Sequence, residues 1–270
     1  LFLLSVGLTL IFGMLDVVNL AHGSFYLLGA YAGLTLIAAT GNFWLALVAA
    51  PLVVGTIGAL IERGLLRPLY RRPTLDQVLL TFGLIYFFED VVKWIWGGKI
   101  RSIPTPALFS GSVKLGPLTI PSYRLFVIAF GLVMAVALWL LIEKTRLGSI
   151  IRAGVFDAEM TAGLGINISR VFTGVFAFGA ALGGLSGVIA GPIQSAYPSM
   201  GVSILIPALI VVVVGGLGSL KGSLVGSLII GQAETFGKAW LPGLSMLMIY
   251  LVMAAIVLLR PQGLFGRPLK

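Results

Sequence analysis

The stretch Arg170-Val-Phe-Thr-Gly-Val-Phe-Ala-Phe-Gly-Ala-Ala-Leu-Gly-Gly-Leu-Ser-Gly-Val-Ile-Ala-Gly-Pro192 decides the fold class. It is uncharged after Arg170, and it is long enough to cross a bilayer, which takes about 20 apolar residues in an α-helix. Its glycines include a ladder at every fourth position, formed by Gly179, Gly183, Gly187 and Gly191. Small residues in this register let another helix approach closely. The stretch therefore predicts a membrane helix that packs against other helices.

The rest of the chain is similarly apolar. Of its 270 residues, 59% are hydrophobic and 10% are charged, and the mean hydropathy is +1.09. Soluble domains carry about 25% charged residues. Because lipid offers no hydrogen-bonding partner, backbone that crosses a bilayer pairs within helices. We expect an all-α, polytopic transmembrane helical bundle of about eight or nine spans, some broken or short, in a single domain over residues 1–270. The predicted spans are 1–13, 22–40, 43–64, 75–97, 123–143, 170–192, 202–216, 221–237 and 244–260.

Three of these spans are short. The chain begins at Leu1, inside an apolar run, and not at Met. We therefore expect residues 1–13 to be the remainder of a longer, truncated helix and not a signal peptide. The spans 202–216 and 221–237 could be half-helices.

Positive charge predicts the orientation. Lys and Arg concentrate in cytoplasmic connections, and if the spans alternate, the basic segments 62–73, 143–170 and the tail from 260 fall on one side. With Lys221 they hold twelve of the eighteen Lys and Arg residues. The sequence thus places the N-terminus outside and the C-terminus in the cytoplasm. The 98–122 connection would face outward as an ordered loop without a long helix, because it contains four prolines.

Two Gly-containing segments interrupt the apolar pattern. The first, Gly13 to Gly23, lies where a cytoplasmic loop is expected but has no Lys or Arg, and the second reads Gly215-Gly-Leu-Gly-Ser-Leu-Lys-Gly-Ser223. Non-helical backbone at membrane depth survives only where protein buries it or where it lines a wet cavity. Paired breaks of this kind indicate a transport site. The candidate substrate-pathway residues are Asp16, Asn19, His22, Gly23, Gly215, Gly218 and Glu234.

The polar candidates also have simpler interpretations. Asp16, Asn19 and His22 recur at intervals of three and could share a helical face. A polar residue in a membrane segment is a functional candidate, but Asn19 and His22 could instead cap the broken helix ends, and we favour the cap. Exposed amides at such a helix start would also attract a carboxylate. For Glu234, an i, i+4 ion pair with Lys238 is the simpler expectation.

No catalytic or nucleotide-binding pattern is visible in the sequence. The segment 216–223 differs from a P-loop because Leu220, and not Gly, precedes Lys221. Gly163-Leu-Gly165 lacks the third glycine of a dinucleotide fingerprint. With one histidine and no cysteine, neither a metal centre nor a thiolate site is expected. The chain is therefore not predicted to be an enzyme, and we expect no cofactor and no metal.

The charged segment 144–170 is a candidate for docking a partner. An apolar stripe of Ile151, Val155, Met160 and Leu164 predicts a short amphipathic helix on the cytoplasmic surface, and the glycines that follow fit a helix stop. Such a helix could lie on lipid or dock in a partner's groove. An ordinary solvated loop is equally compatible with the pattern. The candidate coupling residues are Arg152, Asp157, Glu159, Gly163 and Gly165.

Three motifs resemble a known family. Gly7-Leu-Thr-Leu-Ile-Phe-Gly13, followed by Val18-Asn-Leu-Ala-His-Gly-Ser-Phe-Tyr-Leu-Leu-Gly-Ala-Tyr31, resembles the N-terminal signature of the branched-chain amino-acid ABC importer permeases of the LivH type. The segment 152–167 resembles that family's coupling segment, and Leu259-Arg-Pro-Gln-Gly-Leu-Phe-Gly266 resembles its C-terminus. The resemblance covers essentially the whole chain. Leu20 departs from it, since an aromatic residue is more usual there.

The resemblance implies a function and a set of partners. The chain would be a permease subunit in the bacterial inner membrane that translocates branched-chain amino acids. It would pair with a second, different permease subunit and with two ABC ATPase subunits, and a periplasmic solute-binding protein would deliver the substrate. ATP-driven closure of the ATPases would move segment 144–170 and the spans attached to it.

The residues alone leave two other functions open. An ion-coupled secondary transporter would use intramembrane carboxylates such as Asp16 or Glu234, and a passive channel would conduct a small solute such as urea or an amide. Segment 144–170 discriminates among the three. An importer needs it for coupling, whereas the other two could lose the charged side chains of this segment with little effect.

Overall fold

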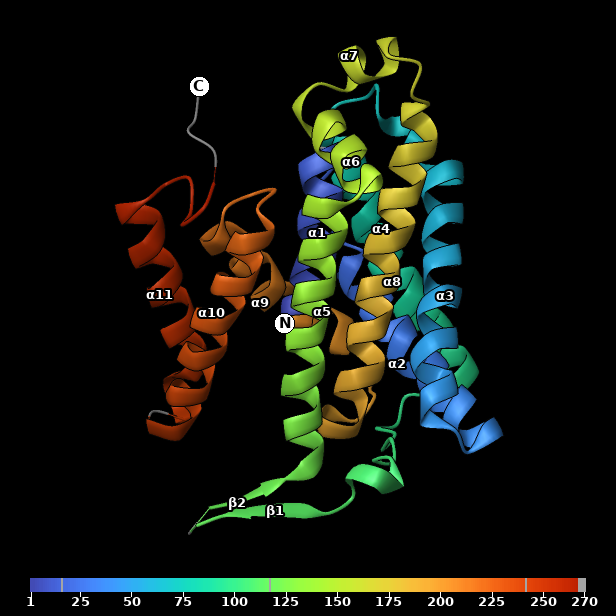
Figure 1. Ribbon diagram of the computed structural model, residues 1–270. Helices are drawn as coiled ribbons and strands as arrows, with labels where there is room; N and C mark the ends of the chain where they lie inside the picture. The colour runs from blue at the N-terminus through green and yellow to red at the C-terminus, as the bar shows by residue number, and fades with distance from the viewer. Residues whose placement is uncertain (16, 117, 241, 267–270) are drawn as a thin grey trace.

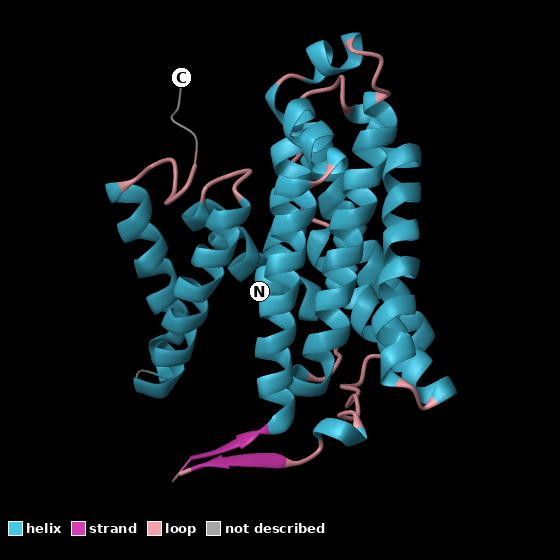
Figure 2. Ribbon diagram, viewed as in Figure 1, coloured by secondary structure: helices cyan, strands magenta, loops and turns pink. Residues whose placement is uncertain are grey.

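The computed structural model describes residues 1–15, 17–116, 118–240 and 242–266, and most of the described chain is helical (Figures 1 and 2). The helices are α1 (Phe2–Leu15), α2 (His22–Thr40), α3 (Phe43–Ile61), α4 (Thr74–Trp96), α5 (Ser122–Lys144), α6 (Arg146–Phe156), α7 (Ala158–Gly163), α8 (Ile168–Gln194), α9 (Met200–Gly215), α10 (Leu220–Trp240) and α11 (Ser245–Leu259). A π-helical turn, η1 (Glu62–Leu66), extends α3, and the 3₁₀ turns are η2 (Arg67–Leu69), η3 (Ala107–Phe109) and η4 (Pro242–Leu244).

The predicted polytopic helical bundle is confirmed, because each predicted span overlaps one of these helices over most of its length. Among the described residues, four helical segments are long and apolar enough to cross a membrane by length and composition: His22–Thr40, Phe43–Leu69, Ser122–Lys144 and Ile168–Gln194. The half-helix expectation is wrong for α10, which has 21 residues and extends for about 31 Å. The half-helix expectation agrees better with α9, which has 16 residues.

Loops alternate between the two ends of the bundle. Helices α6 and α7, the α9–α10 turn and the C-terminal segment lie at the upper end in Figure 1, and the α2–α3 turn lies at the lower end. The lower end also carries an antiparallel hairpin of β1 (Ser112–Leu115) and β2 (Leu118–Pro121), paired from Ser112↔Pro121 to Leu115↔Leu118. In the described part of the 98–122 connection, this hairpin and the turn η3 are present and no long helix is found, as predicted. The hairpin itself was not predicted.

Side-chain caps and glycines set some of the helix ends. Asn42 caps α3, because its Oδ1 accepts hydrogen bonds from the backbone N–H groups of Trp44 at 2.9 Å and Leu45 at 3.1 Å. Asn167 caps α8 in the same way through the N–H of Arg170 at 3.1 Å. Gly41 ends α2 with φ of +67°, a left-handed conformation that glycine adopts without a Cβ clash.

Helix α8 lies at the centre of a block with α1, α2 and α3, which we call the glycine-packed block. The glycine ladder of α8 faces helices of its own chain. A Cβ on Gly179 would lie 2.9 Å from the carbonyl oxygen of Gly7 in α1, and one on Gly187 would collide with the backbone of Tyr26 in α2. At the far end of the ladder, Gly191 meets the side chain of Ile103. In this chain the ladder therefore brings α1 and α2 against α8.

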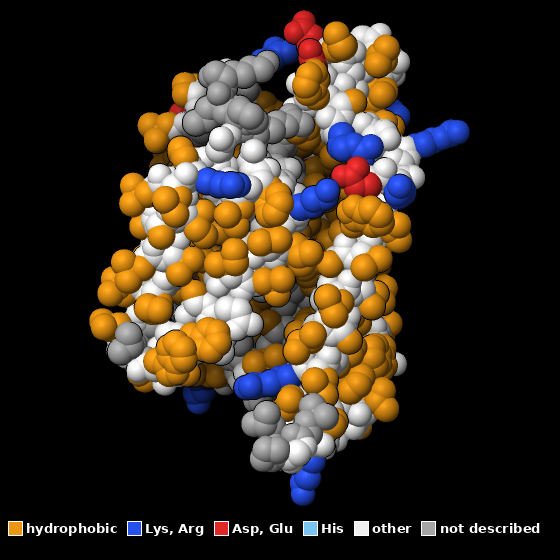
Figure 3. All heavy atoms as spheres, turned by 60° about the vertical axis from the view of Figure 1, so that its left-hand side comes forward, with side chains coloured by type: hydrophobic (Ala, Val, Ile, Leu, Met, Phe, Trp, Pro, Cys, Tyr) orange, Lys and Arg blue, Asp and Glu red, His pale blue; other side chains and the backbone are white. Residues whose placement is uncertain are grey.

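Helices α9, α10 and α11 pack on one another and form a second group, the C-terminal unit (Figure 1). This unit meets the glycine-packed block through α1 and α2. On the face shown in Figure 3, hydrophobic side chains cover a broad middle belt, and Lys and Arg gather above and below it. Such a belt is the surface that a bilayer core requires.

Candidate functional site

The two predicted breaks lie against each other in space. Helix α1 ends at Leu15, and α9 ends at Gly215. Gly216 and Gly218 then have φ of +97° and +77°, so the α9–α10 turn uses a left-handed backbone that suits glycine. A Cβ added to Gly13 would lie 2.9 Å from the Cα of Gly218. The break at the end of α1 therefore packs directly on the α9–α10 turn.

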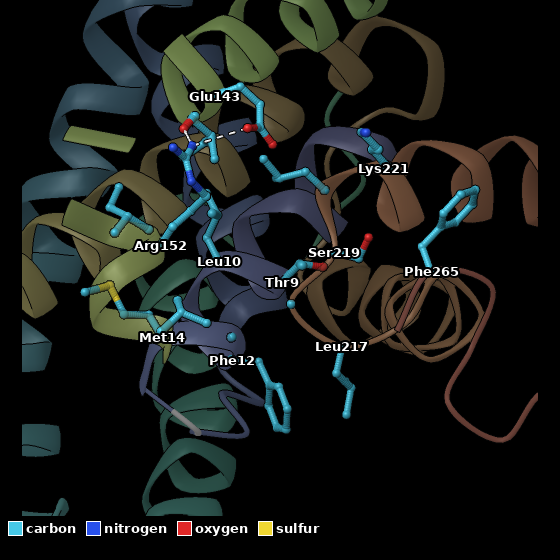
Figure 4. A pocket seen from close by; sticks show the side chains of 16 residues that line it. Thr9, Leu10, Phe12, Met14, Glu143, Arg152, Leu217, Ser219, Lys221 and Phe265 are labelled. Atoms are coloured by element: carbon cyan, nitrogen blue, oxygen red, sulfur yellow. Dashed lines mark hydrogen bonds and ion pairs between the residues drawn. The ribbon is translucent and has the colours of Figure 1, made fainter. Parts of the chain in front are cut away.

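A cavity of about 680 Å³ opens beside this junction; we call it the upper cavity. The ends of α1 and α5, helix α6 and the α9–α10 turn line it. Figure 4 shows Arg152 of α6 pointing towards Glu143 of α5, whereas Lys221 and Phe265 lie on the opposite wall. The Arg152 Nη1 lies 3.5 Å from the Glu143 Oε2, and the guanidinium also donates to the carbonyl of Ile142. The upper cavity is thus polar and charged.

A second cavity, the lower cavity, has a volume of about 620 Å³ and is lined by the other end of α1 and by α2, α8, α9, α10 and α11. Its polar groups include Tyr26, whose hydroxyl donates to the Gln194 Oε1 at 2.8 Å. Glu234 also lines it, and its Oε1 lies 2.6 Å from the Nζ of Lys238. Apolar lining comes from Leu4, Met200, Ile204, Pro207 and Ile249. The lower cavity thus combines both signs of charge with an aliphatic wall.

Between the two cavities, α1 is joined to the C-terminal unit by hydroxyl contacts that we call the seam. Ser5, next to Leu4 of the lower cavity, donates from its Oγ to the carbonyl oxygen of Ala208 at 3.4 Å. Thr9, which lines the upper cavity, has its Oγ1 2.7 Å from the Oγ of Ser223. The three hydroxyl residues are at most 1% exposed. Buried polar contacts of α1 with α9 and α10 therefore lie between the two cavities.

The residues of the first break have other roles than the sequence suggested. Asp16 lies outside the described residues. The favoured cap interpretation is wrong, because Ala21 is the N-cap of α2 and no side chain bonds there. The His22 Nε2 instead lies 3.0 Å from the carbonyl oxygen of Leu4. Asn19 precedes the helix, so it shares no helical face with His22.

Asn19 and His22 are both buried, and neither lines either cavity. Both amide atoms of Asn19 lack a hydrogen-bond partner within the described part of the chain, which is uncommon for a buried side chain. Gly23 packs on the backbone of Gly201 at the start of α9. Among the predicted pathway residues that the structure describes, Gly218 and Glu234 are the two that line the cavities.

Segment 144–170 forms two helices, and the prediction of one continuous stripe is wrong. The chain breaks at Asp157, whose Oδ1 accepts a hydrogen bond from the N–H of Met160 at 2.8 Å and so caps α7. Val155 of α6 is partly buried against the bundle, whereas Met160 and Leu164 are 68% and 77% exposed. The side chain of Arg152 lines the upper cavity, so it is not part of this exposed tip.

The remaining coupling candidates lie at that exposed tip. Asp157, Glu159, Gly163 and Gly165 are all exposed. Helix α7 ends at Gly163, and Gly165 has φ of +83°. The tip therefore presents two carboxylates beside exposed apolar side chains, at the upper end of the bundle (Figure 1).

A buried carboxylate that was not predicted, Glu62, lies in the π-helical turn η1. It is fully buried and paired with Arg67, whose Nη2 lies 3.1 Å from the Glu62 Oε2. Thr173 and Tyr70 donate to the same carboxylate at 2.7 and 3.1 Å. Burial, together with the Glu62 charge, raises the pKa of the Tyr70 phenol. Arg67 also donates to the carbonyl of Ser169 at 3.0 Å, so the cluster fixes the end of α3 to the start of α8.

The fold and the cavities define the class of the protein. It is a polytopic helical membrane permease, with an apolar belt and a cavity with charged groups at each end of the seam. The chain belongs to the family of branched-chain amino acid transport system permease components, whose model matches residues 1–257.

Curated relatives cover nearly the whole chain. It is 31% identical over 280 residues to the high-affinity branched-chain amino acid transport system permease protein BraD of Pseudomonas aeruginosa, covering 98% of this chain and 91% of the relative. It is 29% identical over 286 residues to the permease protein LivH of Escherichia coli K12, with the same coverage. A probable LivH of Methanocaldococcus jannaschii is 29% identical over 283 residues, covering 98% of this chain and 88% of the relative. No solved structure matches the chain.

Proposed function

We propose that this chain is the membrane-spanning permease subunit of an ATP-driven ABC importer that translocates branched-chain amino acids across the bacterial inner membrane. The observation that carries the proposal is the pair of cavities at the two ends of the seam. A solute that occupied them in turn would pass along α1, between the glycine-packed block and the C-terminal unit. Separating Thr9 from Ser223 would open that path.

The lower cavity supports an amino-acid substrate. A branched-chain amino acid carries an ammonium, a carboxylate and an aliphatic side chain. Glu234 and Lys238 offer the complementary charges, and residues such as Leu4 and Ile204 offer an aliphatic wall. The Glu234 and Lys238 side chains are 31% and 64% exposed, and groups of opposite charge at a cavity wall bind such a zwitterion through charge-assisted hydrogen bonds.

The exposed tip of α7 supports the ATPase partner. Exposed apolar side chains beside charged ones are typical of a docking surface, and the tip is connected to α5 through α6 and to α8 through residues 164–167. A partner that moved the tip would move both helices. We propose that two ABC ATPases bind this end, that a second, different permease completes the membrane domain, and that a periplasmic binding protein delivers the substrate.

This proposal implies the orientation: α6–α7 and the C-terminal segment are cytoplasmic, the hairpin faces the periplasm, and α1 runs from the periplasmic side of the bundle towards the cytoplasmic side. The chain has no cysteine, so introduced thiols report their side of the membrane. Gly111→Cys and Gly163→Cys suit this purpose, because both positions are exposed and have open space at the Cβ. A membrane-impermeant thiol reagent added to intact cells should label the Gly111→Cys variant only after outer-membrane permeabilisation and the Gly163→Cys variant only after inner-membrane lysis. The reverse pattern would refute the orientation.

Reconstitution tests the function itself. Proteoliposomes with this chain alone should not take up radiolabelled leucine, with or without a proton or sodium gradient. Addition of the ATPases, the second permease, the binding protein and ATP should start uptake. Gradient-driven uptake by the chain alone would instead identify a secondary transporter.

The docking surface can be tested in the same system. The double variant Met160→Asp/Leu164→Asp should lose ATPase binding in a pull-down and lose ATP-driven uptake. The matched control is Ile100→Asp, which is 73% exposed in the connection that leads to the hairpin, at the other end of the bundle. It should bind the ATPases normally. Normal binding by the double variant would place the ATPases elsewhere.

A further inference from the structure

A groove of about 280 Å³ runs between α5 and α10, beside the upper cavity. Leu132, Val136 and Trp139 of α5 form one wall, and Phe2 and Leu224 contribute to the rest. Among the described residues that line the groove, Lys221 is the one that carries a charge. The groove is therefore an apolar slot with an ammonium group at its edge.

A second ammonium lies at the same end of the groove. The Lys144 Nζ lies 5.7 Å from the ring centroid of Trp139, which lines the slot. Helix α5 ends at Lys144 and α10 begins at Leu220, so both lysines lie at the upper end of the bundle in Figure 1. A tryptophan beside lysines at the end of a membrane helix is typical of the headgroup level.

The two lysines carry charge that the protein does not neutralise. Within the described part of the chain, neither has a carboxylate within ion-pair distance. The nearby Glu143 is paired with Arg152 at 3.5 Å, so that pair adds no net charge. The headgroup end of an apolar groove is therefore left with an excess of two positive charges.

We propose that this groove binds an anionic phospholipid, with an acyl chain against Trp139 and Leu224 and the phosphate between Lys144 and Lys221. Basic pockets between membrane helices on the cytoplasmic side bind anionic headgroups in this way. A zwitterionic lipid would fill the apolar slot equally well but would leave the two lysine charges unbalanced. The lipid would bridge α5 and α10, and so connect the helix that carries α6–α7 to the C-terminal unit.

Competitive lipid retention tests the proposal. The purified chain is delipidated, mixed with equal amounts of dioleoyl phosphatidylglycerol and dioleoyl phosphatidylcholine, and weighed with its bound lipids by native mass spectrometry. The wild type should retain phosphatidylglycerol preferentially. Each lysine near a membrane surface contributes about a fivefold preference for an anionic lipid, so Lys144→Gln/Lys221→Gln should lower the preference by up to about 30-fold, whereas Lys144→Arg/Lys221→Arg should keep it.

Two further variants distinguish recognition of the lipid headgroup from binding of the acyl chain. Lys99→Gln/Lys114→Gln removes two exposed lysines from the 98–122 connection at the opposite end and should leave the preference unchanged. Leu224→Trp should fill the slot and lower retention of both lipids, while its unfolding temperature stays close to the wild-type value.

Equal retention of both lipids by the wild type, or an unchanged preference in Lys144→Gln/Lys221→Gln, would overturn the proposal. Release of phosphatidylglycerol when the second permease is added would also overturn it, because the groove would then be a subunit interface. None of these readouts depends on amino-acid transport.

Discussion

The glycine-packed block and the junction between this block and the C-terminal unit are built differently. Inside the block, backbones touch: Gly29 faces Gly184, and Gly187 faces Tyr26, with no room for a Cβ. At the junction, a cavity lies at each end of the seam, and hydroxyl pairs such as Thr9–Ser223 hold the helices together. Close-packed interiors resist sliding, whereas a few hydrogen bonds exchange readily for water. The comparison predicts that the block is rigid and that the junction moves.

A cross-link across the seam should have the largest effect. In Thr9→Cys/Ser223→Cys, the two sulfurs would replace hydroxyl oxygens that lie 2.7 Å apart, a spacing close enough for a disulfide to form with little movement. Oxidation should abolish ATP-driven leucine uptake in the reconstituted importer, because α1 could no longer separate from α10. A reducing agent should restore it.

A matched cross-link inside the block provides the control. A Cβ on Gly33 in α2 would lie 3.6 Å from the Cβ of Val188 in α8, which is also a disulfide spacing. The oxidised Gly33→Cys/Val188→Cys variant should keep its uptake. Full uptake by the cross-linked seam variant would show that the junction does not move. Loss of uptake in both oxidised variants would show that the two regions do not differ.

Breaking the Glu62 cluster should have the largest effect on stability. Glu62→Ala leaves the Arg67 guanidinium without its carboxylate, and removal of one partner from a fully buried ion pair costs about 3–5 kcal/mol of unfolding free energy. Because the Arg67 side chain is 36% exposed, we expect a loss near the lower end of that range, about 3 kcal/mol. The control is Asp76→Ala, which breaks an exposed pair with Arg72 at 3.9 Å and should cost less than about 1 kcal/mol. Thermal unfolding in detergent measures both. Equal losses would mean that the cluster does not hold α3 to α8.

A smaller loss is expected from overpacking the α2–α8 contact. Gly187→Val places a branched side chain against the backbone of Tyr26 and should cost about 1–3 kcal/mol, or more because a backbone cannot move aside as a side chain does. Gly174 lies on the same helix with open space at its Cβ, so Gly174→Val should leave the unfolding temperature nearly unchanged. If Gly187→Val were tolerated equally, the block would be less tightly packed than the structure indicates.

Local sequence patterns predicted most of the fold but less of the site. Apolar length placed the spans, a stretch without Lys or Arg located the first break, and glycine content located the second, because these signals lie within a single segment. The Thr9–Ser223 contact joins residues 214 positions apart, and a lone threonine or serine in an apolar span has no distinguishing pattern. The cap interpretation failed for a similar reason, since the partner of His22 is the backbone of Leu4 in another helix.

The sequence does carry a signal for the Glu62 cluster. The arginines of segment 62–73 indicate orientation, but Glu62 also precedes Arg67 by five residues. On a π-helical turn, residues five positions apart lie close together, whereas on a regular α-helix the neighbours are three or four positions apart. Glu62 begins the π-helical turn η1 and Arg67 follows it directly, so the two side chains meet. The spacing could have suggested an ion pair, but the π turn itself depends on the packing against α8.

The smallest expected effect on stability is that of Glu234→Gln in the C-terminal unit. Its pair with Lys238 is an i, i+4 contact on a helix, and the Glu234 side chain is 31% exposed, so the loss of unfolding free energy should be about 0.5 kcal/mol or less.

Glu89→Gln is the matched control, because Glu89 pairs with Lys93 at i, i+4 and 2.9 Å but lies outside both cavities. If the lower cavity receives the substrate's ammonium group, Glu234→Gln should raise the KM for leucine uptake while Glu89→Gln does not. The unfolding temperature should be nearly the same for both variants, so a difference in KM between them would come from the position of the carboxylate in the pathway and not from the loss of a helix ion pair. Equal KM values would remove Glu234 from the pathway and leave the seam as the remaining support for a route along α1.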